Sequence, residues 1–339
     1  MISAFPPAWT LAATTFSWTP DIVDARLSTL EITTGIIRDG VTDVIELEPG
    51  QLWRSFPSPD GREVDEFRAG IEEAGGRVSI AGLSIDEFSP DGKRRNALER
   101  ENFLVPQLEA AARVGASGVR LPAGAAGADL LERLRPRLEA LELTLFEEIQ
   151  GSQRIDQPNV KSAIDTIAAL DDPRIRLLID TSMFMPALPV TYLEVLRSGG
   201  LDNDLVDLLE QEWQDPAITG KVMAALHNGK VPPPLFKVYM NMVIRYGRSR
   251  PEDMDAIFPL VGGLHLKFWD LEDESSRVSG PIRDMGAVLA RHGFTGTVCS
   301  EWGGHDWLED ENATDLTIQH LAIAREALNA GASLDVGSR

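Results

Sequence analysis

The chain has 339 residues, of which 43% are hydrophobic and 25% charged, so it can bury an ordinary core and is not disordered as a whole. Its 53 acidic and 32 basic residues give a net charge of −21, which argues against nucleic acid or an anionic membrane as a partner. The single cysteine, Cys299, cannot form an internal disulfide and suits a reducing compartment. No basic signal-peptide region and no apolar run of about 18 residues is visible, so we expect a cytoplasmic protein.

Eight short strand-like runs follow one another along the chain. They lie at 12–18, 42–48, 77–83, 117–122, 142–149, 175–181, 262–268 and 295–301. Amphipathic helical patterns separate most of them, and this alternation at intervals of about 30 residues predicts βαβ units in a parallel sheet. Eight units favour a (β/α)₈ TIM barrel that forms a single domain over 1–339. A doubly wound open sheet is the alternative, but no Gly-rich phosphate fingerprint follows the first run.

The interval between the sixth and seventh runs is much longer than the others. Residues 185–262 form a mostly helical insertion with three helical patterns, followed by the segment 231–247, which is rich in aromatic residues and methionine. An insertion of this size at the catalytic face of a barrel is usually a lid, a specificity wall or an interface. We therefore predict a lid or partner interface, and a helical appendage that only packs on the barrel is the alternative.

Four ligand-type residues end four consecutive predicted strands. They are Glu148, Asp180, His265 and Glu301. In a parallel barrel the C-terminal ends of the strands open onto the active site, so these side chains are predicted to converge there. Three carboxylates and one imidazole suit a divalent cation, with Mn²⁺ as the first choice and Mg²⁺, Co²⁺ or Zn²⁺ as alternatives. Each residue alone has a plainer explanation, such as a helix cap, a core histidine or a salt bridge, and only their joint occurrence predicts a metal site.

Further candidates lie beside these four. Lys267 shares the inward parity of His265 and is predicted to hold a substrate oxygen, with a salt bridge to Glu301 as the alternative. Arg120 ends the fourth run and is either a substrate contact or one half of an ion pair inside the barrel. His305 is a candidate general base, or else a solvated loop histidine.

Aromatic and acidic residues near other strand ends are less specific signals. The tryptophans there offer aromatic faces to a sugar or aryl ring, although some of them belong to the core. They are Trp18, Trp53, Trp269 and Trp302, of which Trp18 and Trp302 are predicted to bind substrate. Glu46 and Glu48 share one parity on the second run and need be no more than loop charges.

Four segments resemble the sugar phosphate isomerase/epimerase superfamily, whose fold is a xylose isomerase-like TIM barrel. The segments are LTLFEEIQG, RIRLLIDTSMF, LHLKFWD and TGTVCSEWGG. The separations of 32 residues between Glu148 and Asp180 and of 36 residues between His265 and Glu301 are similar to those of ketose 3-epimerases. The resemblance covers roughly 12–184 and 262–330 and leaves the insertion unmatched.

The sequence departs from the superfamily pattern after the sixth predicted strand. Many members carry Asp-x-x-His after the sixth strand, whereas Met183 stands at that histidine's position here. This argues against a multi-metal phosphodiesterase or endonuclease and weakens an ordinary epimerase assignment. The run DTSMFMPALP followed by a long insertion looks most like the catalytic alpha subunit of bacterial C-glycoside deglycosidases. The resemblance implies bound Mn²⁺, a small beta-sandwich beta subunit as partner and a 3-oxo-glucoside substrate.

The resemblance implies a lyase reaction, with a proton removed next to the ketone and the aglycone then eliminated. Glu148 and Glu301 are the expected acid/base residues as well as ligands, and His305 is the outside candidate. The insertion would bind the partner subunit and the aromatic aglycone, so we expect an oligomer. The alternatives are a sugar (phosphate) isomerase/3-epimerase or a keto-inositol dehydratase with the same metal-enediolate chemistry, and, from another class, a non-catalytic barrel scaffold subunit.

Overall fold

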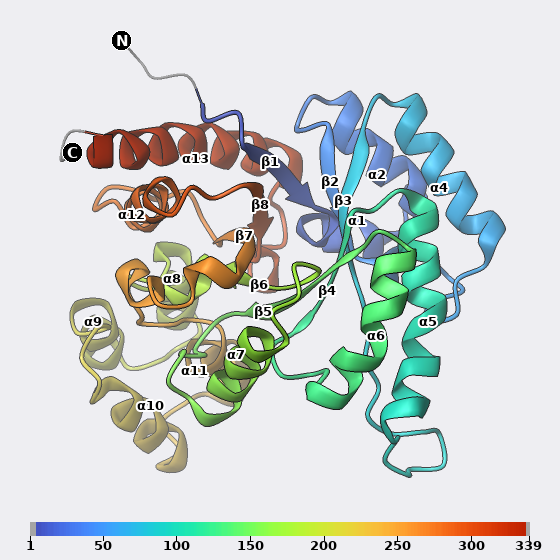
Figure 1. Cartoon of the computed structure of the whole chain (residues 1–339). Helices are drawn as coiled ribbons and strands as arrows, with labels where there is room; N and C mark the ends of the chain where they lie inside the picture. Colours follow the sequence, from blue (N-terminus) through green and yellow to red (C-terminus); the bar gives the residue numbers. More distant parts are fainter. Residues whose placement is uncertain (1–4, 337–339) are drawn as a thin grey trace.

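A closed barrel of eight parallel strands, in the order β1 to β8, organises the chain (Figure 1). The computed structural model describes residues 5–336. The strands are β1 (Trp9–Thr14), β2 (Val44–Leu47), β3 (Arg77–Gly82), β4 (Gly118–Pro122), β5 (Thr144–Ile149), β6 (Ile175–Asp180), β7 (Val261–Phe268) and β8 (Gly296–Trp302). The barrel closes where β1 pairs with β8, with Trp9 opposite Gly296. The predicted (β/α)₈ architecture is confirmed.

Helices surround the barrel and connect its strands. They are α1 (Thr19–Asp24), α2 (Thr29–Arg38), α3 (Pro49–Leu52), α4 (Gly61–Glu73), α5 (Ala97–Val114), α6 (Ala128–Ala140), α7 (Pro158–Leu170), α12 (Ser279–Arg291) and α13 (Ala313–Val336). Short 3₁₀ turns lie at Thr15–Trp18, Thr181–Met183, Pro233–Leu235, Pro251–Met254, Phe258–Leu260 and Gly304–Asp306. None of the helices within residues 5–336 has the length and apolar character that a membrane crossing requires.

The first strand ends earlier than the sequence suggests. The run 12–18 is predicted as a strand, but β1 stops at Thr14, and a 3₁₀ turn takes up Thr15–Trp18. The cause is local, because the Thr14 hydroxyl accepts a hydrogen bond from the backbone N–H of Phe16 and so caps this turn. Trp18 therefore lies one turn beyond the strand end, in a buried position.

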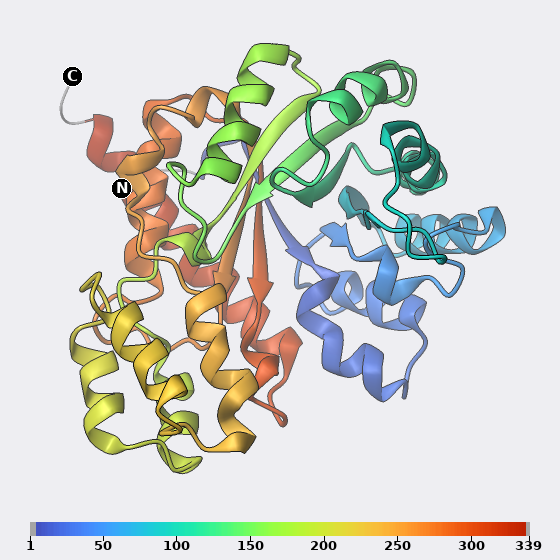
Figure 2. The same ribbon diagram turned by 90° about the horizontal axis from the view of Figure 1, so that it is seen from below.

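The segment between β6 and β7 contains four helices of its own. They are α8 (Val190–Ser198), α9 (Asn203–Gln211), α10 (Ile218–His227) and α11 (Phe236–Ile244). In Figure 2 they form one group beside the ends of β7 and β8, apart from the helices around the rest of the barrel. Their apolar residues make a second core that includes Tyr192, Trp213, Tyr239 and Tyr246 and reaches Trp269 just after β7.

Backbone hydrogen bonds attach the end of this segment to the barrel. The N–H of Ser152 donates to Ile244 O at 3.0 Å, and the N–H of Gly247 donates to Ser182 O at 2.7 Å. Gly151 has a φ of 59°, and a Cβ built there would lie only 2.3 Å from Ile244 O. Only glycine allows this close approach, so the end of α11 is fixed to the loops that follow β5 and β6.

Candidate metal centre

The structure brings the four predicted ligands together. Strand register places Asp180 of β6 beside His265 of β7, and the side chains of Glu148 and Glu301 reach the same point from β5 and β8. One ligand atom from each residue lies within 4.8 Å of the others, and all four residues are buried. Such a group could hold a metal ion, and each of its members projects from the C-terminal half of a strand, toward the end of the barrel where active sites lie.

Several polar atoms in this cluster lack hydrogen-bond partners. His265 Nδ1 lies 2.9 Å from Glu148 Oε1 and 2.8 Å from Glu301 Oε2, but neither contact has hydrogen-bond geometry. Asp180 Oδ1 accepts a hydrogen bond from the N–H of Ser182 at 2.7 Å, whereas its Oδ2 is buried without a partner. Buried polar atoms without partners are costly, and a cation among them would satisfy all of them at once.

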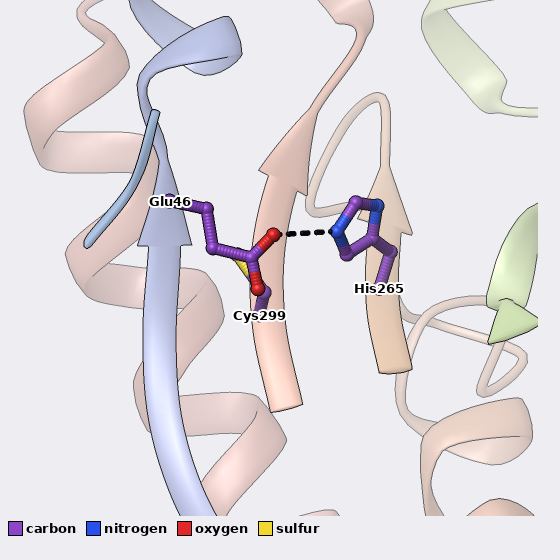
Figure 3. Close-up of side chains that lie close together, drawn as sticks. All are labelled: Glu46, His265 and Cys299. Carbon is purple, nitrogen blue, oxygen red and sulfur yellow. Dashed lines mark hydrogen bonds and ion pairs between the residues drawn. The ribbon is translucent and has the colours of Figure 1, made fainter. Parts of the chain in front are cut away.

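A carboxylate on the far side of the imidazole fixes its orientation. Glu46 Oε2 lies 2.9 Å from His265 Nε2, and both side chains are buried (Figure 3). A carboxylate can only accept, so Nε2 carries the hydrogen and Nδ1 faces Glu148 and Glu301. Metal-binding histidines commonly have such a partner on the second ring nitrogen. In the sequence, the only signal for Glu46 is its parity on the second predicted strand, which does not distinguish it from a loop charge.

Cys299 lies next to this pair and forms a second group with Glu46 and His265 that is close enough to hold an ion. Burial, with a further contribution from the Glu46 charge, raises the pKa of the Cys299 thiol well above its ordinary value. Because the thiolate is the form that binds metals, the protonated thiol is a poor ligand. We therefore place the candidate centre on the other side of the imidazole.

The charges of the cluster depend on one another. Burial alone would lower the pKa of His265, but Glu46, Glu148 and Glu301 raise it well above its ordinary value. Burial and the charge of Glu301 raise the pKa of Asp180 to about 7. Without a cation the site thus retains protons that a divalent cation would displace, because metal ligands bind in their deprotonated forms.

A cavity of about 520 Å³ opens above the cluster. Asp180 and Glu301 lie in its wall, together with Lys267 and Trp269 from the end of β7. The insertion contributes to the same wall through residues 244–245 at the end of α11. A volume of this size accommodates a sugar-sized ligand next to the candidate metal position.

Lys267 and Arg120 form ion pairs and also face this cavity. Lys267 Nζ lies 2.5 Å from Glu301 Oε1 and 4.4 Å from the centroid of the Phe16 ring. Arg120 Nη1 lies 2.5 Å from Glu148 Oε2, and its Nη2 pairs with Glu48. Each cation therefore fixes one oxygen of a clustered carboxylate and remains in reach of a molecule in the cavity.

The other predicted residues lie outside the residues that line this cavity. The His305 ring packs against Phe16 and Trp302, and burial lowers its pKa to about 4, so the ring is neutral. The Trp18 indole donates to Thr314 Oγ1 at 3.1 Å. The Trp302 indole donates to a backbone carbonyl at 3.0 Å and is fully buried. The structure thus gives both predicted tryptophans packing contacts, and Trp269 is the tryptophan that faces the cavity.

Proteins of known activity resemble this chain over most of its length, although no family model matches it. The 3′-dehydrocarminate deglycosidase alpha subunit of a Microbacterium species is 27% identical over 82% of this chain and 82% of its own length. A C-glycoside deglycosidase alpha subunit of Arthrobacter globiformis is 23% identical over 94% of this chain and 92% of its own.

Solved structures with the same fold include sugar epimerases. The D-allulose 3-epimerase of a Methylomonas species has a TM-score of 0.57 at 13% identity and covers 96% of this chain and 100% of its own. The 3-keto-D-glucoside 4-epimerase of E. coli has a TM-score of 0.53 at 13% identity, with coverage of 93% and 98%. The chain is thus a sequence relative of the C-glycoside deglycosidase alpha subunits. Its fold is the barrel that is also found in xylose isomerase-like sugar isomerases and epimerases.

Proposed function

We propose that this protein is the catalytic subunit of a metal-dependent carbon–carbon lyase, which cleaves the C-glycosidic bond of 3-oxo-C-glucosides. The observation that carries the proposal is the convergence of three carboxylates and one imidazole beside a sugar-sized cavity. The names of the sequence relatives supply the substrate class. Together these features favour chemistry at a keto-sugar over a role as a non-catalytic scaffold.

The four clustered residues are the proposed metal ligands. Oxygen-rich sets with one imidazole suit Mn²⁺ well, and Mg²⁺, Co²⁺ or Zn²⁺ are the alternatives. When bound, such a cation polarises a ketone and stabilises the negative charge that develops as a neighbouring proton leaves. The ligands are Glu148, Asp180, His265 and Glu301.

The proposed reaction is a β-elimination that needs no oxidant. A base removes the C2 proton beside the C3 ketone, and the freed electron pair forms the C1–C2 double bond. The bond from C1 to the aryl carbon breaks, its electron pair moves to the aryl carbon, and that carbon takes up a proton. Glu148 and Glu301 are the proposed acid/base residues, because each has one oxygen held by a cation and the other beside His265.

Neighbouring residues have proposed supporting roles. Lys267 and Arg120 reach the cavity and would hold oxygen atoms of the sugar. Neutral His305 is a less favoured candidate for the base than Glu148 and Glu301. It packs beside Phe16 at the edge of the cavity.

The insertion has a proposed role in binding larger groups. Residues 244–245 form part of the cavity wall, where an aromatic aglycone would lie beyond the sugar. The relatives are named alpha subunits, a name that implies a partner subunit in those proteins. By this likeness we propose a small beta-sandwich beta subunit as the partner of this chain and a hetero-oligomer as its working form.

The decisive experiment combines metal analysis with a substrate panel. Purified protein is analysed for stoichiometric metal, then incubated with Mn²⁺ and with free keto-sugars, keto-inositols and 3-oxo-C-glucosides, and the products are identified by mass. We expect aglycone release from the C-glucosides only. Epimerised free ketoses would support the isomerase alternative, and a protein that takes up no metal would support the scaffold.

Glu301→Gln tests the site directly. We expect it to lose turnover while its circular dichroism spectrum stays unchanged. Glu101→Gln is a matched control, because Glu101 is a partly buried glutamate that also pairs with a basic side chain, Arg133, but lies outside the cavity. Turnover retained by Glu301→Gln would remove Glu301 from the mechanism.

A further inference from the structure

Glu48 is a cavity carboxylate that lies outside the metal-ligand group. It directly follows β2, lines the same cavity as Asp180 and Glu301, and keeps 21% of its side chain exposed. Its backbone N–H donates to Thr15 Oγ1 at 2.9 Å, which fixes the start of its side chain. We propose that Glu48 is a further catalytic residue, the acid that protonates the departing aryl carbon without binding the metal. This inference rests on the proposed lyase function.

The carboxylate of Glu48 lies beside Gly82, in space that a larger side chain at position 82 would fill. A Cβ built on Gly82, the last residue of β3, would lie 2.6 Å from Glu48 Oε2 and 3.1 Å from Glu48 Cδ. Real atoms do not approach so closely, so any larger residue at Gly82 would displace the carboxylate. The neighbouring strand thus sets where the Glu48 carboxyl group can stand in the cavity.

One guanidinium links Glu48 to the proposed metal ligands. Arg120 pairs with Glu148 through Nη1 and with Glu48 through Nη2. The two carboxylates therefore lie on two branches of the same side chain, one in the ligand cluster and one in the open cavity. This separation suits two roles in one reaction, with one group at the ketone and the other at the leaving carbon.

The net charge of the site favours one proton on a carboxyl group outside the ligand cluster. Five carboxyl groups gather here beside two basic side chains, Arg120 and Lys267. The carboxyl groups are those of Glu46, Glu48, Glu148, Asp180 and Glu301. With a divalent cation and neutral His265 in place, one negative charge remains, and a proton on one carboxyl group would neutralise it. A metal-bound carboxylate holds a proton only in passing during the reaction, because metal ligands bind in their deprotonated forms, so the proton of the resting site belongs on a carboxyl group outside the ligand cluster.

Glu48 is the carboxyl group best placed to carry this proton. Burial raises the pKa of Glu48 even though the charge of Arg120 lowers it. In the reaction, Glu48 gives its proton to the aryl carbon as that carbon receives the electron pair of the broken bond. The C2 proton goes to Glu148 or Glu301, and exchange with solvent through the cavity restores both groups to their starting forms.

The test separates the two proton transfers. The Mn²⁺-loaded full chain, with its partner subunit if one co-purifies, is given a 3-oxo-C-glucoside of a hydroxylated phenyl ring in D₂O. Aglycone release is followed by mass, and deuterium entry at C2 is followed by NMR. For Glu48→Gln we expect release to fall by about 100-fold or more, the scale of a lost general acid, while C2 exchange and metal content stay near wild type. Gly82→Ala should give the same pattern more weakly, and the control Glu101→Gln should change neither reading.

Two results overturn the assignment in distinguishable ways. If the wild type releases aglycone and Glu48→Gln does so equally fast, or loses exchange and release in parallel, Glu48 is not the acid and the lyase function stands. If the wild-type protein releases no aglycone at all, the proposed function fails, and the role of Glu48 fails with it.

Discussion

Replacing Glu46 by glutamine or alanine tests whether the imidazole of His265 is held for metal binding. The Glu46 carboxylate lies 2.9 Å from His265 Nε2 in a buried environment, so its charge acts on the ring without solvent screening. Glutamine can still accept the hydrogen bond but carries no charge, whereas alanine removes both. Losing such a partner costs about 10–100-fold in metal affinity, or about 1.4–2.7 kcal/mol. We expect Glu46→Gln near the lower value and Glu46→Ala near the upper one.

Titration of Mn²⁺ into apoprotein against a competing chelator measures this loss, and circular dichroism reports whether the fold is intact. Cys299→Ala is the matched control, because Cys299 is buried beside the same two residues and is expected to leave the affinity unchanged. Wild-type affinity in both Glu46 variants would refute the reasoning. A loss in Cys299→Ala would instead move the ion to the Glu46 side of the imidazole.

Three further predictions concern stability. Gly151→Ala puts a Cβ 2.3 Å from Ile244 O at a φ of 59°, so we expect about 1–3 kcal/mol lower stability and faster hydrogen exchange at the end of α11. Trp213→Ala empties the core of the insertion and should cost about 3–5 kcal/mol, seen as earlier proteolysis between β6 and β7 while Mn²⁺ binding persists. Burial lowers the pKa of His320 to about 3, so the unfolded chain binds the extra proton as the pH falls below about 6.5. The contribution of His320 to stability should then fall by about 1.4 kcal/mol per pH unit down to about pH 3, and His320→Gln, unlike the exposed His227→Gln, should remove this contribution from the pH dependence measured in urea titrations.

The four members of the candidate metal centre could be predicted because each one breaks a simple pattern. Asp180 ends an apolar strand, and the two-residue alternation turns Glu148 toward the barrel interior while Glu147 turns outward, where its carboxylate accepts the N–H groups of Gly124 and Ala126. A parallel barrel then brings the strand ends together without further information. The same logic failed for β1, because the hydroxyl of Thr14 caps a turn that the apolar pattern does not reveal.

Contacts across the barrel could not be predicted in the same way. β2 and β7 are not neighbours in the sheet, so nothing in either strand shows that Glu46 meets His265. Trp302 is different, because a usable signal was missed. The alternation that turns Glu301 inward turns Trp302 outward, and its indole lies buried outside the cavity lining.

The attachment of the insertion explains how one barrel could serve different substrates. The end of its last helix, α11, is hydrogen-bonded to the loops that follow β5 and β6. Because these strands carry Glu148 and Asp180, the same part of the barrel holds both the outer cavity wall and the candidate metal position. The insertion otherwise has its own core. Ile244, at the shared rim, is 62% exposed, so its side chain can change at little cost to stability. Substitutions at the rim should therefore alter which molecules fit the cavity while the ligand cluster beneath it keeps its geometry.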